Sequence, residues 1–283
     1  MYHHVDTNSF FKVCQQIDRR QYANHNRAPT TQDFANPRLS DTYSQPQFLT
    51  QSEQLVQICR KLSLKQLEEI MHISPHLAEV NQQRFRDWKP PFTLDNALQA
   101  IFAYGGDIYN SMRVSELSLH ELDYMQKTVS ILSGLYGLLR PLDLIQPYRL
   151  SMNVRLENPK GINLYHFWHD ILTNHLNQIE TDTIIDLAFD NYFKVIDSDK
   201  LKAKVIKPVF LDEKAGKYMN VNAYDKEAMG LMTRYIVRNK LESSKMLHEF
   251  SDHGYQYCAK ESNEHELVFK RSEKTAQQYQ NRN

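Results

Sequence analysis

Between residues 52 and 88 the hydrophobic positions recur with the period of an α-helix. In the first part of this segment they are three or four residues apart: Leu55, Ile58 and Leu62. Such spacing places side chains on one helix face. Ser63 with Gln66 then forms a capping-box pattern, and Ser74 before Pro75 is a typical N-cap and first helical position. The pattern predicts three consecutive helices.

Two more helices are predicted between residues 93 and 134. The first carries its apolar side chains on one face and ends at a pair of glycines: Ala97, Ala100, Ile101 and Tyr104, then Gly105 and Gly106. The second begins at the capping box of Ser118 and Glu121, and its apolar stripe continues through Leu132 to Gly134. The first half of the chain is therefore predicted to be mostly helical.

Short apolar, β-branched runs replace the helical period in the second half. They are Thr183 to Phe189, Lys204 to Leu211 and Glu266 to Arg271, and runs of this kind predict strands. The connection from Lys214 to Lys217 predicts a hairpin in which Gly216 has a positive φ, and residues 225–241 look helical. We expect a mixed α+β domain with a helix-rich first half and a sheet-forming second half.

Changes in amino-acid composition along the chain predict the domain boundaries. Residues 20–50 are rich in Asn, Gln, Thr, Ser and Pro and lack an apolar period, which is typical of weakly ordered chain. No repeat of 20–50 residues and no interior linker rich in Pro, Gly or Ser divides the remainder. We therefore expect an atypical leader at 1–50, a single domain at 51–272 and a polar tail at 273–283.

Charge and cysteine content narrow the function classes. Lys plus Arg and Asp plus Glu both number 34, so no global positive field draws the protein to nucleic acid or membranes. The three cysteines form no CxxC pair, and no apolar run approaches a membrane span. His166 and His169 are flanked by aromatic residues that favour packing over metal binding. We expect a cytoplasmic protein without metal or cofactor.

The densest motif is the segment LSGLYGLLRPLD, residues 132–143. Gly134 and Gly137 allow a tight bend whose backbone N–H groups face a phosphate, with Arg140 and Arg149 nearby as donors. A Pro-terminated turn that only redirects the chain explains the same residues. From Gln126 to Lys160 five basic residues stand against two acidic ones; this excess suits a few phosphate contacts better than an extended DNA track.

A second candidate follows the predicted strand at residues 183–189. The residues from Asp190 to Lys194, with Tyr192 among them, occupy the position where sheet proteins place ligand-binding groups. A solvated loop is an equally good interpretation. No GxSxG, Walker A or GxGxxG sequence occurs, which removes the commonest hydrolase and nucleotide-binding signatures.

The stretch LSGLYGLLRPLDLIQPYRL closely resembles the LSGLYG-x-LRPLD-x-x-x-PYRLEMG block of the YaaA family of bacterial peroxide-stress proteins. Further matches are Arg84-Phe85 with Trp88, Gly106-Asp107-Ile108-Tyr109, Lys207-Pro208-Val209-Phe210-Leu211-Asp212, and Gly230-Leu231-Met232 with Arg234. The likeness runs from about Asp33 to Ser272.

The resemblance implies a single domain of the family's own architecture, a role in limiting damage from hydrogen peroxide and free iron, and DNA binding. The family's helix-hairpin-helix-like DNA element would correspond to Gly134, Tyr136, Gly137 and Arg140, together with Arg149. The resemblance also suggests groups in a polar cleft: Arg155, Tyr192, Lys194 and Arg234.

Six positions depart from the family pattern. Thr30 stands at its lysine, Ser151 and Asn153 stand at the glutamate and glycine of RLEMG, Phe189 and Asn191 stand at a serine and a glutamate, and Met229 stands at an arginine. The family's first strand also has no counterpart directly before residue 27, which predicts lower stability. We expect the fold to persist while the cleft has lost polar groups.

Three functions stay open at this point. The first is weak DNA binding through the Gly134 to Arg149 region in the oxidative-stress response. The second is an enzyme or binding protein for a small nucleotide-like or phosphorylated ligand, with Tyr136, Arg149, Tyr192 and Lys194 in its cleft. The third is an inactive paralogue. We expect binding in preference to catalysis, and the sequence names neither a substrate nor an oligomeric state.

Overall fold

The computed structural model describes residues 11–16, 32–34, 40–179 and 181–280, with residues 11–16 as backbone only. The helices of four or more residues are α1 (Leu49–Arg60), α2 (Leu64–Met71), α3 (Pro75–Asp87), α4 (Ala100–Ala103), α5 (Asp107–Met112), α6 (Leu119–Thr128), α7 (Leu164–Gln178), α8 (Asp190–Phe193), α9 (Asn222–Asn239) and α10 (Glu273–Gln280). Three 3-10 turns are η1 (Val114–Glu116), η2 (Ser244–Glu249) and η3 (Asp252–Gly254). The strands are β1 (Phe11–Gln16), β2 (Leu98–Gln99), β3 (Val129–Ser133), β4 (Gly137–Leu139), β5 (Leu144–Ile145), β6 (Thr183–Asp186), β7 (Lys204–Lys214), β8 (Lys217–Met219), β9 (Gln256–Tyr257) and β10 (Glu266–Arg271).

One sheet runs through the molecule in the order β4-β3-β1-β6-β7-β10-β9, with β8 added to β7. Strands β3, β1, β6, β7 and β10 are parallel neighbours, whereas β4, β8 and β9 are antiparallel. The carboxyl ends of β1, β3 and β6 therefore meet at one edge. Ligands of parallel sheets bind outside this edge, so the topology indicates where to look for a site.

The mixed α+β fold is confirmed, and strand β1 corrects one expectation about it. The first strand is not missing: Phe11–Gln16 lies between β3 and β6 and pairs with both. It is separated from the family-like segment at residue 27, which is why the resemblance alone did not locate it. Thr30 lies outside the described residues.

Most predicted helices are confirmed, with two corrections. Ser63–Gln66 and Ser118–Glu121 both form capping boxes. However, α6 ends at Thr128, and residues 129–133 form β3 instead of continuing the helix. Val129 and Ile131 are β-branched and fully buried beside β1, so sheet pairing outweighs the helical stripe. The helix predicted from residue 93 is reduced to the single turn α4 after strand β2.

In the second half, the predicted strands and the hairpin are confirmed. Strands β6, β7 and β10 occupy the three expected runs, and Gly216 in the β7–β8 turn has φ +78°. The tail beyond residue 272 contains α10, in which Ala276 is buried. The boundaries of the single domain stay a prediction.

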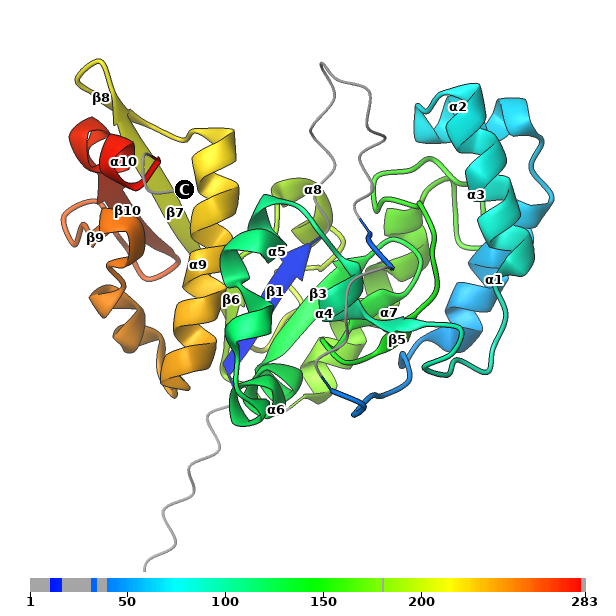
Figure 1. Ribbon diagram of the computed structural model, residues 1–283, viewed down its shortest axis with the longest axis horizontal. Helices are drawn as coiled ribbons and strands as arrows, with labels where there is room; N and C mark the ends of the chain where they lie inside the picture. The colour runs from blue at the N-terminus through cyan, green and yellow to red at the C-terminus, as the bar shows by residue number, and fades with distance from the viewer. Residues whose placement is uncertain (1–10, 17–31, 35–39, 180, 281–283) are drawn as a thin grey trace, which may run out of the picture.

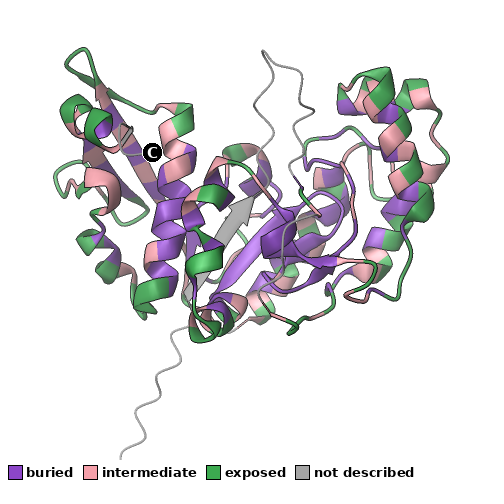
Figure 2. Cartoon of the chain, viewed as in Figure 1, coloured by how far each residue is buried: buried purple, intermediate pink, exposed green. Residues whose placement is uncertain are grey.

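Helices pack around the sheet, and three of them lie apart at one end of the molecule. Helix α9 packs along α5, while α1, α2 and α3 form a helical group at the edge of the molecule, on the right in Figure 1. The buried side chains gather on β3 and on the inner side of α9, whereas α2 and α3 expose their outer sides (Figure 2).

Candidate functional site

The glycine bend at residues 134–137 is the turn of a buried β-hairpin. It joins β3 to β4 and contains no helix, in contrast to the helix-hairpin-helix that the resemblance implies. A Cβ atom at Gly134 would lie 2.3 Å from the Leu150 carbonyl oxygen. At Gly137, with φ +71°, it would lie 2.7 Å from the Trp168 ring. Both glycines are therefore required by close packing.

Tyr136 and Arg140 are also held by internal contacts. The Tyr136 hydroxyl is fully buried and accepts hydrogen bonds from Trp88 Nε1 at 2.9 Å and from the Gln146 backbone N–H at 3.0 Å. Arg140 donates to the buried Asp143 carboxylate, from Nε at 3.1 Å and from Nη2 at 2.9 Å. The side chain of Arg140 remains 36% exposed, so it is the part of this segment that solvent reaches.

Arg149 lies beside a second guanidinium group that sequence reasoning missed. Burial lowers the pKa of Arg84, and the positive charge of Arg149 lowers it further. Both side chains are half-buried, and Arg84 has no ion pair with a carboxylate in the described part of the chain. Two like charges held together at reduced hydration favour an anion between them. The Arg84-Phe85 match was the sequence signal for this site.

Arg84 belongs to a tight helical hairpin. Helices α2 and α3 pack against each other and are joined by the short turn His72-Ile73-Ser74, in which His72 has φ +50° and Ser74 caps α3. Cationic and imidazole side chains are exposed on and around this hairpin: Lys61, Lys65, His72, His76, Arg86 and Lys89. Carboxylates are exposed on the same helices: Glu69, Glu79 and Asp87. The Arg84–Arg149 pair therefore adjoins an exposed surface of mixed charge, which we call the α2–α3 surface.

A buried cluster of hydroxyl groups lies at the carboxyl end of β3 and includes Tyr148, which precedes Arg149 in the chain. The Tyr148 hydroxyl is 2.6 Å from Ser133 Oγ and 2.9 Å from the Tyr104 hydroxyl. Burial, followed by the neighbouring tyrosine charges, raises the pKa of Tyr104 and Tyr109 well above the usual range. Both phenols stay protonated at neutral pH, and the Tyr104 hydroxyl takes part in the hydrogen bonds of the cluster.

A cavity of about 340 Å³ opens beyond the carboxyl end of β6. Two of the departures from the family pattern, Phe189 and Met229, line it together with Asp190, Lys207 and Asp225. Lys207 forms an ion pair with Asp190. Burial raises the pKa of Asp225 to about 6. Apolar side chains thus occupy two positions where the family pattern has a serine and an arginine.

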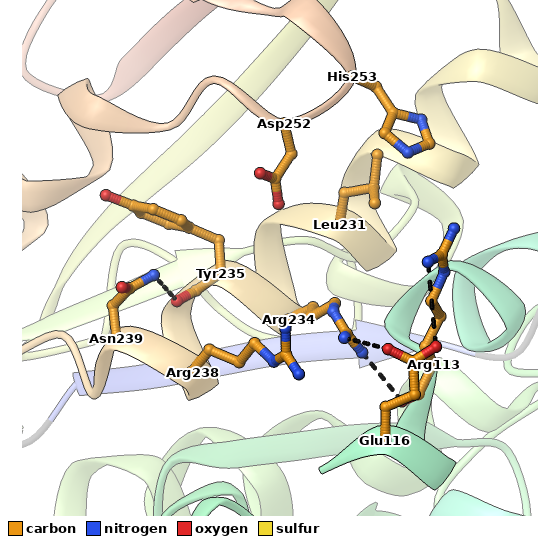
Figure 3. A pocket seen from close by; sticks show the side chains of 9 residues that line it. All are labelled: Arg113, Glu116, Leu231, Arg234, Tyr235, Arg238, Asn239, Asp252 and His253. Atoms are coloured by element: carbon orange, nitrogen blue, oxygen red, sulfur yellow. Dashed lines mark hydrogen bonds and ion pairs between the residues drawn. The ribbon is translucent and has the colours of Figure 1, made fainter. Parts of the chain in front are cut away.

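The structure does not gather the four predicted cleft residues in one place. Arg155 and Lys194 are exposed, whereas Tyr192 is buried in α8 near Tyr109. Arg234 lies on α9 in a separate cavity with Arg113 and Glu116 (Figure 3). Of the other departures, Ser151 Oγ donates to Asn153 Oδ1 at 2.6 Å.

His169 contacts the segment between α8 and β7. His169 Nδ1 lies 3.2 Å from the Val195 carbonyl oxygen, and its Nε2 lies 3.4 Å from Asp197. Within the described residues no group of three or more His, Cys, Asp or Glu side chains is arranged to hold a metal ion. In the same part of the chain, every helix is too short or too polar to cross a membrane.

A comparison with known protein families finds a match over most of the chain. The family model described as "Peroxide stress protein YaaA" matches residues 27–261. The match includes α1 to α9, Arg84, Arg149 and the residues that line the cavity beside β6 except Glu266, but it does not include β1, β10 or α10.

Proposed function

Because this chain belongs to the YaaA family of peroxide stress proteins, we propose that it binds the phosphate backbone of DNA in the peroxide response, through Arg84, Arg149 and the α2–α3 surface. The observation that carries the proposal is the half-buried position of Arg84 near Arg149: burial, and then the positive charge of Arg149, lowers the pKa of Arg84. A phosphate between them accepts hydrogen bonds from both and offsets their repulsion.

The helical hairpin provides an exposed surface for phosphate contacts, which the buried glycine bend does not. Its turn and the N-terminus of α3 are exposed, with Ser74, Pro75 and His76 at the surface. A helix N-terminus carries partial positive charge and favours phosphate. Contacts of this kind hold a duplex without reading its sequence, so the binding is local and weak, as the neutral net charge requires.

The direct test is duplex binding by fluorescence anisotropy. The variant Arg84→Ala with Arg149→Ala is expected to lose at least about tenfold in affinity. The matched control is Lys217→Ala with Lys260→Ala, which removes two exposed charges from the opposite part of the chain and is expected to bind like the wild type. Equal binding by both double variants would refute the proposal.

A second function is favoured by the half-burial of the same arginine pair. A recessed guanidinium pair next to the Tyr104–Tyr148–Ser133 hydroxyl cluster also fits the phosphate of a small nucleotide-like ligand. Titration with adenosine monophosphate separates the two functions. Competition of the nucleotide with DNA at the arginine pair, with the nucleotide bound more tightly than the duplex, would favour this ligand; DNA binding without nucleotide binding would exclude it.

A further inference from the structure

The cavity shown in Figure 3 lies apart from the arginine pair, between α9, the turn η1 and the turn η3. Its volume is about 390 Å³. Three arginines and two carboxylates line it: Arg113, Arg234, Arg238, Glu116 and Asp252. Leu231 and Tyr235 add an apolar wall. The cavity therefore combines both signs of charge with a hydrophobic surface.

Arg234 is a structural member of this cavity. Its Nη1 donates to the carbonyl oxygens of Met112 and Arg113 at 2.8 and 3.0 Å, and its Nη2 donates to Glu116 at 2.6 Å. Only 8% of the side chain is exposed. These bonds tie α9 to the end of α5 and fix the floor of the cavity, so Arg234 has little capacity left for a ligand.

The other two arginines are available to a ligand. Arg113 Nη1 lies 3.9 Å from Glu116, and Arg238 Nε lies 3.6 Å from Glu121, both beyond hydrogen-bonding distance. Their side chains are 50% and 46% exposed. In Figure 3 both guanidinium groups come from the walls that flank Arg234. A carboxylate that enters between them gains charge-assisted hydrogen bonds.

Asp252 provides the opposite charge on the far wall, on η3. Its carboxyl group is half-buried and makes no hydrogen bond or ion pair with another described residue. Burial raises the pKa of Asp252, although His253, Arg234 and Arg238 oppose the rise. The group has thus lost hydration without gaining a donor, and an ammonium group of a ligand would supply one.

We propose that this cavity binds a small zwitterion of the α-amino acid class. The ligand carboxylate lies between Arg113 and Arg238, its ammonium group lies at Asp252, and its side chain packs on Leu231 and Tyr235. A purely anionic ligand fits less well because it would face Asp252 and Glu116 as well as the arginines. The site is independent of the DNA-binding proposal.

Calorimetric titration with three matched probes tests the proposal. L-leucine carries both charges, isocaproate lacks the ammonium group and isoamylamine lacks the carboxylate. L-leucine is expected to bind at least about tenfold more tightly than either analogue, since each analogue leaves one charged wall unpaired. Equal binding of isocaproate or of inorganic phosphate would identify an anion site and overturn the proposal. No binding of L-leucine or of any other proteinogenic L-amino acid would also overturn it.

Two variants test which wall of the cavity binds which charged group of the ligand. Asp252→Asn is expected to lower the affinity for L-leucine to the affinity that the wild type has for isocaproate. Arg238→Gln is expected to lower it to the affinity that the wild type has for isoamylamine. Asp95→Asn, an exposed change elsewhere, is the matched control and should leave binding unchanged. Urea unfolding verifies that each variant is folded, and Arg113→Gln, at a half-exposed side chain, provides a second test of the carboxylate contact if Arg238→Gln is unstable.

Discussion

Burial raises the pKa of Asp186 from 3.8 to about 7, although the Ala188 N–H and Lys207 oppose the rise. Between these two values the folded state holds a proton that the unfolded chain releases, so the stability contributed by this group falls as the pH rises. Above pH 7 the ionised carboxylate is a cost to the fold. The effect belongs to one side chain at the carboxyl end of β6.

Asp186→Asn should remove this cost while keeping an oxygen that accepts from the Ala188 N–H at 2.9 Å. The stability of the variant relative to the wild type is expected to increase by about 3 kcal/mol between pH 5 and pH 8. Urea unfolding at the two pH values measures the difference. A relative stability that does not change with pH would show that Asp186 ionises normally in the folded protein.

The thiol of Cys59 is expected to be unreactive because it is buried. It is fully buried on α1, and burial raises the pKa of its thiol to about 12. Because the thiolate is the reactive form, iodoacetamide at pH 8 should leave Cys59 unmodified in the native protein and modify it in urea. The partly exposed Cys258 is the internal reference. Mass spectrometry that finds Cys59 labelled as fast as Cys258 would contradict this assignment.

At the scale of elements, α5 and α9 meet at a glycine. A Cβ atom at Gly230 would lie 2.1 Å from the Ile108 carbonyl oxygen and 2.0 Å from Ser111 Oγ. Ala normally stabilises a helix interior relative to Gly by about 1 kcal/mol. Here Gly230→Ala should instead destabilise the protein by about 1–3 kcal/mol, because the helices must separate.

Urea midpoints of Gly230→Ala and of the exposed helical control Asn174→Ala check this prediction. The control should change stability by less than about 0.5 kcal/mol. A raised midpoint for Gly230→Ala would mean that the two helices tolerate a methyl group at their contact.

The sequence predicted elements well where one local signal decides. The capping boxes at Ser63 and Ser118 and the hairpin at Gly216 are formed as expected. The prediction failed at residues 129–133, because their apolar positions fit the period of a helix as well as that of a strand. Pairing with β1 makes them a strand. For the site, Arg149 was predicted, but its neighbour Arg84 is 65 positions away in the chain. Only the fold brings such charges together.

At the scale of the whole molecule, β1 links the two halves of the sheet. Val13 pairs with Val129 on one side and with Ile185 on the other. Val13→Pro removes a backbone donor at this central position and should destabilise the protein by about 3 kcal/mol or more. Val13→Thr retains the N–H and the β-branch and should destabilise the protein clearly less than Val13→Pro does. A Pro variant as stable as the Thr variant would place this strand outside the sheet.

The central claim is that Arg84 and Arg149 hold phosphate groups, and the salt dependence of DNA binding tests it most directly. Each neutralised phosphate contributes about 0.9 to the slope of log affinity against log salt concentration. Because both arginines contact the same phosphate, replacement of both by glutamine should reduce the magnitude of this slope by about one. A slope that is the same for the wild type and the double variant would show that these arginines make no phosphate contact.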